Sequence, residues 1–192
     1  SPQFVAQNKL VLGDILVLKG EVWEASLLYS QVDKDYKNDA IGREAKYKNA
    51  RLSYFMGEFE WAAAQLNVLK SATSQLISND AMQLSLLIMD NLGFDSITDP
   101  LMMYSRADLF EFCNRHDQSF ATLDSLLTQY PGHSLTDEAL FRQAGLYYKK
   151  GDYQKAGALY LRVFETFPED ILGDDALYKL ATLTDTKLND PV

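Results

Sequence analysis

A repeated helical pattern constrains the fold of this 192-residue chain more than any other feature. Four segments align without gaps around a turn residue, which is glycine or asparagine each time. The four turn residues are Gly20, Gly57, Asn114 and Gly151. Both residue types adopt positive φ at low cost, as a tight helix C-cap requires. Each turn is therefore predicted to join two antiparallel helices.

Small residues stand at fixed distances from these turns. The positions seven residues before each turn are Gly13, Ala50, Ala107 and Ala144, with a fifth copy at Ala181. The positions five residues after each turn are Ala25, Ala62, Ser119 and Ala156. Successive copies lie 37 residues apart, except for the longer step from Ala50 to Ala107. Small side chains at matched positions let two helices cross closely without leaving voids.

The longer step contains about 20 extra residues between Ser71 and Pro100. In this segment Asn79 and Asp80 are predicted to cap an apolar run, 81–92, which we interpret as one inserted helix. Because the run is apolar nearly all round, we expect the helix to be buried against its neighbours. The whole chain is then predicted to form ten helices.

The pattern around the first and fourth turns resembles the tetratricopeptide repeat. The residues that carry the resemblance are Leu12, Gly13, Gly20, Ala25 and Tyr29 in the first unit, and Ala144, Gly151, Tyr153, Ala156, Tyr160 and Pro168 in the fourth. The resemblance implies an all-α fold, a right-handed α-solenoid of helix-turn-helix repeats with one extra inserted helix. The chain departs from the family where Lys9 and Lys46 replace an early aromatic residue. Its spacing also exceeds the family's usual repeat of about 34 residues, which implies longer connections.

We therefore expect a single array over residues 1–192. Its units are predicted at about 6–38, 39–73, 100–136 and 137–173, with an incomplete unit at 174–192 and the inserted helix at about 79–92. A solenoid normally ends with a polar capping helix, so the incomplete unit favours a fragment of a longer protein. The alternative is that the last helix caps the stack by itself.

The composition narrows the classes of partner. Hydrophobic residues make up 47% of the chain, which argues against disorder. The net charge of -9 argues against nucleic acid as a partner, because nucleic acid needs clustered Lys and Arg. The longest apolar stretches are shorter than the roughly 20 residues that a bilayer requires, so we expect no direct membrane insertion.

Residues that could perform chemistry are few, and we expect no catalytic residue, no metal and no cofactor. Cys113 and His116 have the spacing of two zinc ligands but lack further ligands nearby, so packing is the expected role of His116. His133 follows a Tyr-Pro-Gly loop and is expected to be solvated. Helix capping explains carboxylate pairs such as Asp137 with Glu138, and glycine-rich phosphate-binding motifs are absent.

The resemblance implies that the first helix of each unit lines a concave face. The candidate partner-binding residues on that face are Tyr47, Arg51, Tyr54, Tyr104, Asp108, Phe141, Tyr148, Lys149 and Tyr178. Other inward positions are Leu10, Asp14, Val17, Phe55, Glu111, Phe112 and Asp185. Tyrosine is enriched at binding hot spots, and Arg51 and Lys149 are hypothesised to select acidic or C-terminal groups. The alternatives are that these aromatics pack between units, or that the inserted helix fills the groove.

These observations favour a non-catalytic protein–protein interaction scaffold that binds a protein or peptide partner. The alternatives are a docking arm of a larger multidomain enzyme and a structural array that self-associates through exposed repeat ends. Endings in Tyr-Pro or Phe-Pro, followed by Asp-Asp-Ala-Leu-Tyr, resemble repeats of bacterial cell-envelope assembly lipoproteins. Together with the single cysteine, this resemblance favours the periplasm or an outer-membrane association over the cytoplasm.

Overall fold

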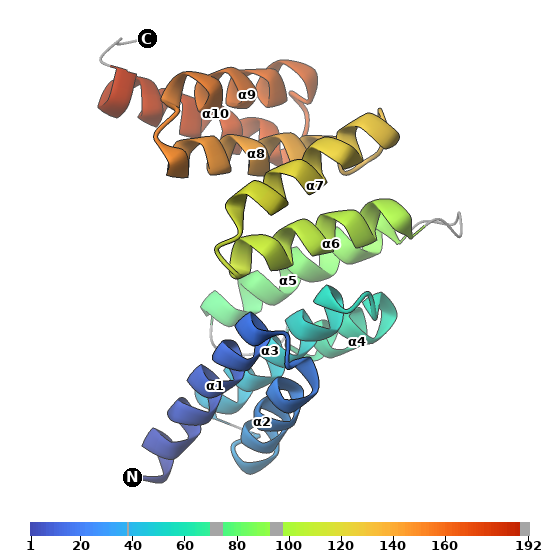
Figure 1. Ribbon diagram of the computed structural model, residues 1–192, viewed down its shortest axis with the longest axis vertical. Coiled ribbons are helices and arrows are strands. Elements are labelled where there is room, and N and C mark those ends of the chain that lie inside the picture. Colours follow the sequence, from blue (N-terminus) through green and yellow to red (C-terminus); the bar gives the residue numbers. More distant parts are fainter. Residues whose placement is uncertain (38, 70–74, 93–97, 189–192) are drawn as a thin grey trace. The chain divides into compact units, whose positions relative to one another are not determined.

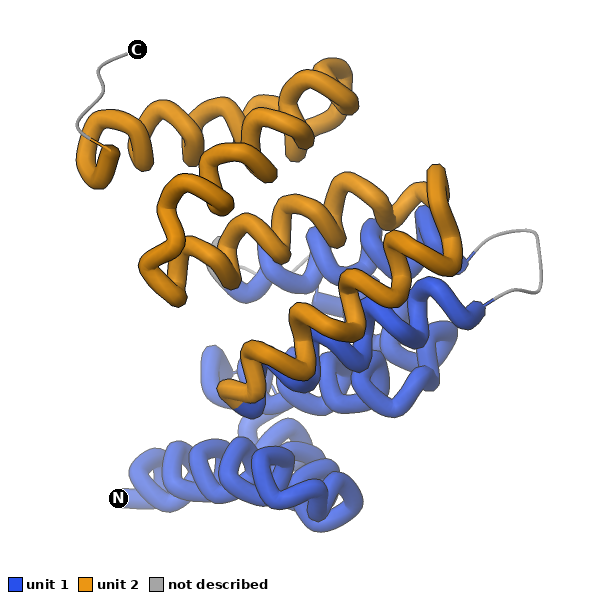
Figure 2. The backbone as a smooth tube through the Cα atoms, turned by 45° about the horizontal axis from the view of Figure 1, so that its top comes forward, with its two compact units in different colours: residues 1–113 blue, residues 114–192 orange. Residues whose placement is uncertain are grey.

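The computed structural model describes residues 1–37, 39–69, 75–92 and 98–188. Within these residues the chain forms ten α-helices and no strand, which confirms the predicted all-α class and the predicted number of helices (Figure 1). The helices fall into two compact units, Ser1–Cys113 and Asn114–Val192 (Figure 2). The division lies in the turn of the third predicted repeat.

The first unit contains six helices, of which the first five pack mainly on their neighbours in the chain. They are α1 (Pro2–Lys19), α2 (Val22–Asp35), α3 (Ala40–Phe55), α4 (Phe59–Leu69), α5 (Gln75–Asn91) and α6 (Asp99–Phe112). The predicted first helices of successive repeats also contact one another, α1 with α3 and α3 with α6. The inserted helix α5 packs on α4 and α3. Helix packing in chain order is the arrangement of a helical repeat solenoid.

The second unit contains the remaining four helices. They are α7 (His116–Gln129), α8 (Thr136–Lys150), α9 (Tyr153–Thr166) and α10 (Ile171–Leu183), and a π-helical turn over Thr184–Leu188 follows. Helices α8, α9 and α10 stack in order, and α8 also contacts α10. Their shared core consists of Leu140, Ala144, Ala156, Tyr160, Val163, Ala176 and Leu183. The residues that carry the repeat pattern therefore form the centre of this unit.

The predicted turn residues all have positive φ. The φ angles are 83°, 80°, 56° and 80° at Gly20, Gly57, Asn114 and Gly151. After the three glycines, the amide of the next residue donates to a carbonyl five residues back, with distances of 2.9 to 3.0 Å. This hydrogen bond is the mark of a helix that ends in a left-handed cap. The prediction of tight helix–turn–helix units is confirmed at these turns.

The small residues lie where helices cross, as the repeat pattern predicts. A Cβ atom on Gly13 would lie 2.4 Å from Cε1 of Tyr29, so the phenol ring packs directly on the backbone of α1. Except for Ala181, the matched small residues are buried. Ala181 is exposed on α10.

The inserted helix differs from its prediction in two ways. It begins at Gln75, so Asn79 and Asp80 lie inside the helix and the predicted cap there is wrong. The expectation that it is buried all round is also wrong. Ala81, Leu84, Ser85, Ile88 and Asn91 are buried, whereas Met82, Leu86 and Met89 are exposed. Apolar composition alone does not say which faces of a helix have neighbours.

Two glycines in the first turns of α3 and α10 allow a preceding carbonyl to come close. A Cβ atom on Gly42 would lie 1.9 Å from the carbonyl oxygen of Tyr36. A Cβ atom on Gly173 would lie 2.5 Å from the carbonyl oxygen of Phe167. Tyr36 and Phe167 are the C-cap residues of the helices that come before. Both connections between repeats therefore depend on the absence of a side chain.

We predict opposite effects for two Gly→Ala substitutions in the second unit. Gly173→Ala should lower the free energy of unfolding by about 1–3 kcal/mol, because the methyl group collides with backbone. Gly145→Ala should raise it by up to about 1 kcal/mol, because alanine favours helix and the nearest atom to its Cβ is 3.9 Å away. Urea denaturation measures both changes. A change of the same sign in the two variants would contradict the packing described here.

Candidate functional site

A cavity of about 430 Å³ in the first unit is the candidate site. Its lining residues are Asp14, Val17, Tyr29, Glu44, Tyr47, Lys48, Arg51, Leu52, Phe55, Ile77, Asp80 and Phe112. Half of them stand on α3 at helical spacing, and the others come from α1, α2, α5 and α6. Such a mixture of aromatic, apolar and charged groups around a concave space is typical of a binding site.

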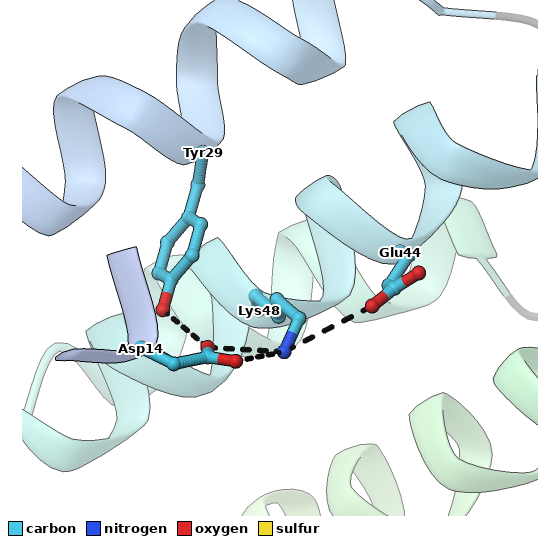
Figure 3. A network of polar contacts seen from close by, with 4 residues as sticks. All are labelled: Asp14, Tyr29, Glu44 and Lys48. Atoms are coloured by element: carbon cyan, nitrogen blue, oxygen red, sulfur yellow. Dashed lines mark hydrogen bonds and ion pairs between the residues drawn. The ribbon is translucent and has the colours of Figure 1, made fainter. Parts of the chain in front are cut away.

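A polar network joins three helices at one side of the cavity (Figure 3). The Tyr29 hydroxyl donates to Asp14 Oδ1 at 2.8 Å, and Lys48 Nζ donates to both oxygens of Asp14 at 3.0 and 2.8 Å. Glu44 Oε1 lies 3.9 Å from the same ammonium group. Burial and the hydrogen bond to Asp14 raise the pKa of the Tyr29 phenol above its usual range, so this phenol stays a neutral donor.

Arg51 is held in place by one carboxylate and two aromatic rings. Its Nη2 atom lies 3.3 Å from Oδ1 of Asp108. Its guanidinium carbon lies 5.1 Å from the ring centre of Phe55 and 5.2 Å from that of Phe112, within the range of cation–π attraction. Because Asp108 and Phe112 belong to α6, these contacts fix the wall of the cavity where α3 meets α6.

The inserted helix supplies another wall of the cavity without filling it. Ile77 and Asp80 of α5 line the cavity together with Tyr47 of α3. Burial raises the pKa of the Tyr47 phenol, Arg51 opposes this shift, and the charge of Asp80 adds to it. The alternative in which the inserted helix fills the groove is therefore not what the structure shows at this position.

The sequence-predicted site residues fall into three groups. Tyr47 and Arg51 line the cavity, and Asp108 lies behind them as the ion-pair partner of Arg51. Tyr54 and Tyr104 are buried, with 0% and 4% of their surface exposed. The residues in the second unit are the half-buried Phe141 and the exposed Tyr148, Lys149 and Tyr178. The ring of Phe141 packs edge-on against Tyr160, and that of Tyr148 packs edge-on against Tyr153.

Sequence reasoning named seven other inward positions, of which Asp14, Val17, Phe55 and Phe112 line the cavity and Leu10, Glu111 and Asp185 do not. It missed Glu44 and Lys48. Their signal was present in the sequence, because Glu44, Lys48, Arg51 and Phe55 follow one another at three- and four-residue steps on α3. Ile77 and Asp80 were missed because the expected start of the inserted helix came after Ile77.

The two histidines, which the sequence offered as candidates for chemistry, are both partly buried in the fold. His133 is half-buried rather than solvated, since its Nδ1 accepts a hydrogen bond from the amide of Leu135 at 3.1 Å. His116 is also half-buried, at the start of α7. Within the described part of the chain, no group of three or more His, Cys, Asp or Glu side chains could hold a metal ion. Among the described residues, no helix is long and apolar enough to cross a bilayer.

The pair Asp137–Glu138 is more than a helix-start signal. Asp137 is only 4% exposed, and a side-chain hydrogen bond links it to Glu138. Burial, followed by that hydrogen bond and the nearby charge of Asp137, raises the pKa of Glu138 to about 9. Neither residue lines the cavity of the first unit. The raised pKa links the protonation of Glu138 to the stability of the fold.

We predict that Glu138 makes stability depend on pH. The pKa of Glu138 is about 9 in the folded chain, compared with the ordinary value of 4.5 for a glutamate carboxyl group. The stabilising effect of the neutral carboxyl group is therefore complete below pH 4.5 and is lost as pH rises towards 9. Glu138→Gln cannot ionise and keeps a donor towards Asp137. Between pH 5 and 9 the wild-type chain should lose at least about 1 kcal/mol of stability relative to this variant. Urea titrations at several pH values measure the difference, and the exposed Glu165→Gln serves as a control that should track the wild type.

Comparison with known proteins finds a similarity that lies in the second unit. Residues 138–170 match the family model of the tetratricopeptide repeat. The match runs from α8 through α9 to the connection before α10, which is one helix–turn–helix unit around Gly151. No curated protein matches the chain. The match shows that this segment is similar to a tetratricopeptide repeat, and such a repeat suggests a protein–protein interaction module.

Proposed function

We propose that this chain is a non-catalytic scaffold that binds a protein or peptide partner in the cavity of its first unit. The cavity itself carries the proposal, because inward positions of three first helices, α1, α3 and α6, surround a space of about 430 Å³. A space of this size admits one or two side chains of a partner segment. The acidic net charge of the chain supports a protein rather than a nucleic acid as the partner.

The contacts within the cavity suggest how a partner would bind. Arg51 already faces Asp108 and two rings, so we assign it to shaping the aromatic wall rather than to capturing a carboxylate. An apolar or aromatic side chain of the partner would enter between Tyr47 and Phe55. Lys48 and Asp14 at the rim would then exchange hydrogen bonds with its backbone. The partner side chain between Tyr47 and Phe55 would be the central contact of this interface. Truncating a central contact typically weakens an interface by more than about 1 kcal/mol.

The exposed aromatic positions of the second unit extend the proposal. Tyr148 and Tyr178 present their rings to solvent, and Lys149 lies next to Tyr148 on α8. These residues would form a separate contact with a partner, with Lys149 selecting an acidic or C-terminal group. The envelope location suggested by the sequence belongs to the same proposal. A larger enzyme that used this chain as a docking arm would bind through the same positions.

The proposal predicts different effects for two lysines on α3. Lys48 lines the cavity and pairs with Asp14, whereas Lys46 pairs with Asp33 at 3.5 Å and does not line it. Peptides selected from a displayed library on the wild-type chain should bind Lys48→Met at least about tenfold more weakly, and Lys46→Met with nearly unchanged affinity. Fluorescence polarisation measures affinity, and thermal melts show that both variants fold. Equal affinities for the two variants would refute binding in the cavity.

Self-association is a second candidate, because both outer helices expose apolar faces. The exposed apolar residues of α1 are Phe4, Val5, Val11, Leu12, Ile15 and Leu18. Those of α10 include Ile171, Leu177 and Tyr178. Contiguous apolar surface of this kind marks an interaction site, and the ends of a repeat array stack on further helices.

Light scattering tests this second candidate. If the array stacks on itself, the mean mass should rise with concentration for the wild-type chain. It should stay at the mass of one chain for Leu12→Glu, because a carboxylate would have to be buried in the contact. A wild-type mass that does not change with concentration would exclude stacking.

A further inference from the structure

Both tryptophans of the chain are exposed, and each lies near the start of a helix. Trp23 lies at the beginning of α2 and is 70% exposed, and Trp61 lies at the beginning of α4 and is 61% exposed. Helix α3 packs on both α2 and α4 (Figure 1), and the two rings line one groove of about 410 Å³ over it. Tryptophan side chains are highly buried on average, so two exposed rings at one groove point to a binding surface.

The floor of this groove is polar but electrically neutral. Ser26 Oγ donates to Asn49 Oδ1 at 2.8 Å, and Asn49 Nδ2 donates to Ser30 Oγ at 3.2 Å. Ser53 accepts from Gln65 at 3.4 Å. These bonds join the helices beneath the groove, and two of them use half of the four hydrogen-bonding sites of the Asn49 amide. Any selection of a ligand by its charge would therefore depend on residues at the rim of the groove rather than at its floor.

The charge that lines the groove is negative. Glu58 is the one charged residue among the described residues that line the groove. Glu24 follows Trp23 and Glu60 precedes Trp61, and both side chains are exposed. A carboxylate beside two indole rings repels anions and attracts cations, and the face of tryptophan is the best aromatic partner for a cation.

We propose that the groove binds an arginine or lysine side chain on an extended segment of a partner protein. The rings of Trp23 and Trp61 would hold the aliphatic stem and the cation, and Glu58 would supply the opposite charge. This surface is separate from the cavity of the proposed function. On α3 the groove uses Asn49 and Ser53, the cavity uses the residues at 44, 47, 48, 51 and 55, and the buried Leu52 borders both.

The groove has a built-in reporter, because the chain contains only these two tryptophans. The full chain is titrated with the capped peptide acetyl-Gly-Gly-Arg-Gly-Gly-amide, and with the same peptide carrying neutral citrulline. We expect a saturable change in tryptophan emission that the citrulline peptide produces at least about tenfold more weakly. The effect should weaken as salt is raised. N-acetyl-tryptophanamide, titrated in the same way, corrects for collisional quenching.

A matched pair of variants tests the role of the rim charge. Glu58 and Glu21 each follow a turn glycine, but only Glu58 lines the groove, and Glu21 pairs with Lys19 at 3.3 Å. Glu58→Gln should weaken binding of the arginine peptide at least about threefold, whereas Glu21→Gln should leave it unchanged. Both side chains are exposed, so neither change should affect folding, and thermal melts verify this.

Three outcomes would overturn the proposal. The first is equal binding of the citrulline and arginine peptides, which would show that the groove does not select a cation. The second is an equal effect of the two glutamate variants. The third is tryptophan emission that depends on protein concentration without peptide, which would show that a second copy covers the groove. None of these outcomes changes the result expected for Lys48→Met. The proposal for the groove and the proposal for the cavity are therefore tested independently.

Discussion

The close contact between a small residue and a large ring organises the first unit. Because Gly13 has no side chain, the ring of Tyr29 packs on the backbone of α1 and brings its hydroxyl within 2.8 Å of Asp14. Asp14 in turn holds Lys48 of α3. A larger residue at position 13 would separate the helices and also break the link from α2 to the cavity. Packing and site geometry thus depend on one constraint.

In the second unit a small residue and a tyrosine stand at the same spacing as in the first unit, but the tyrosine packs against a different side chain. Ala144 and Tyr160 belong to one buried cluster, and Tyr160 packs edge-on against Phe141 at 5.3 Å between ring centres. Burial raises the pKa of the Tyr160 phenol, as it does for Tyr29. A tyrosine at this position thus serves first as a large packing group. Only in the first unit does an acidic residue beside the small one turn the phenol into a link towards a cavity.

Local rules explain which parts of the fold were predictable. A positive φ angle and the volume of a side chain are properties of single positions, so Gly151 and Ala156 could be assigned from their spacing. The fate of the aromatic residues depends on distant neighbours. Tyr54 is buried and Tyr178 is exposed although both occupy first helices, because tyrosine suits a core and a binding surface equally well. The partner of Arg51 could not be read from the sequence either, since Asp108 is 57 residues away.

The two surfaces of the first unit share a support, which bears on how such a scaffold would bind. Leu52 of α3 is buried beneath both the cavity and the groove, while the side chains that meet a ligand differ between them. Because both surfaces are built on the same helix, the distance between a contact in the cavity and a contact in the groove is fixed. A partner segment that engaged both surfaces would gain affinity from the high effective concentration of its second contact, without any new interaction. Weak individual sites would then suffice for a stable complex.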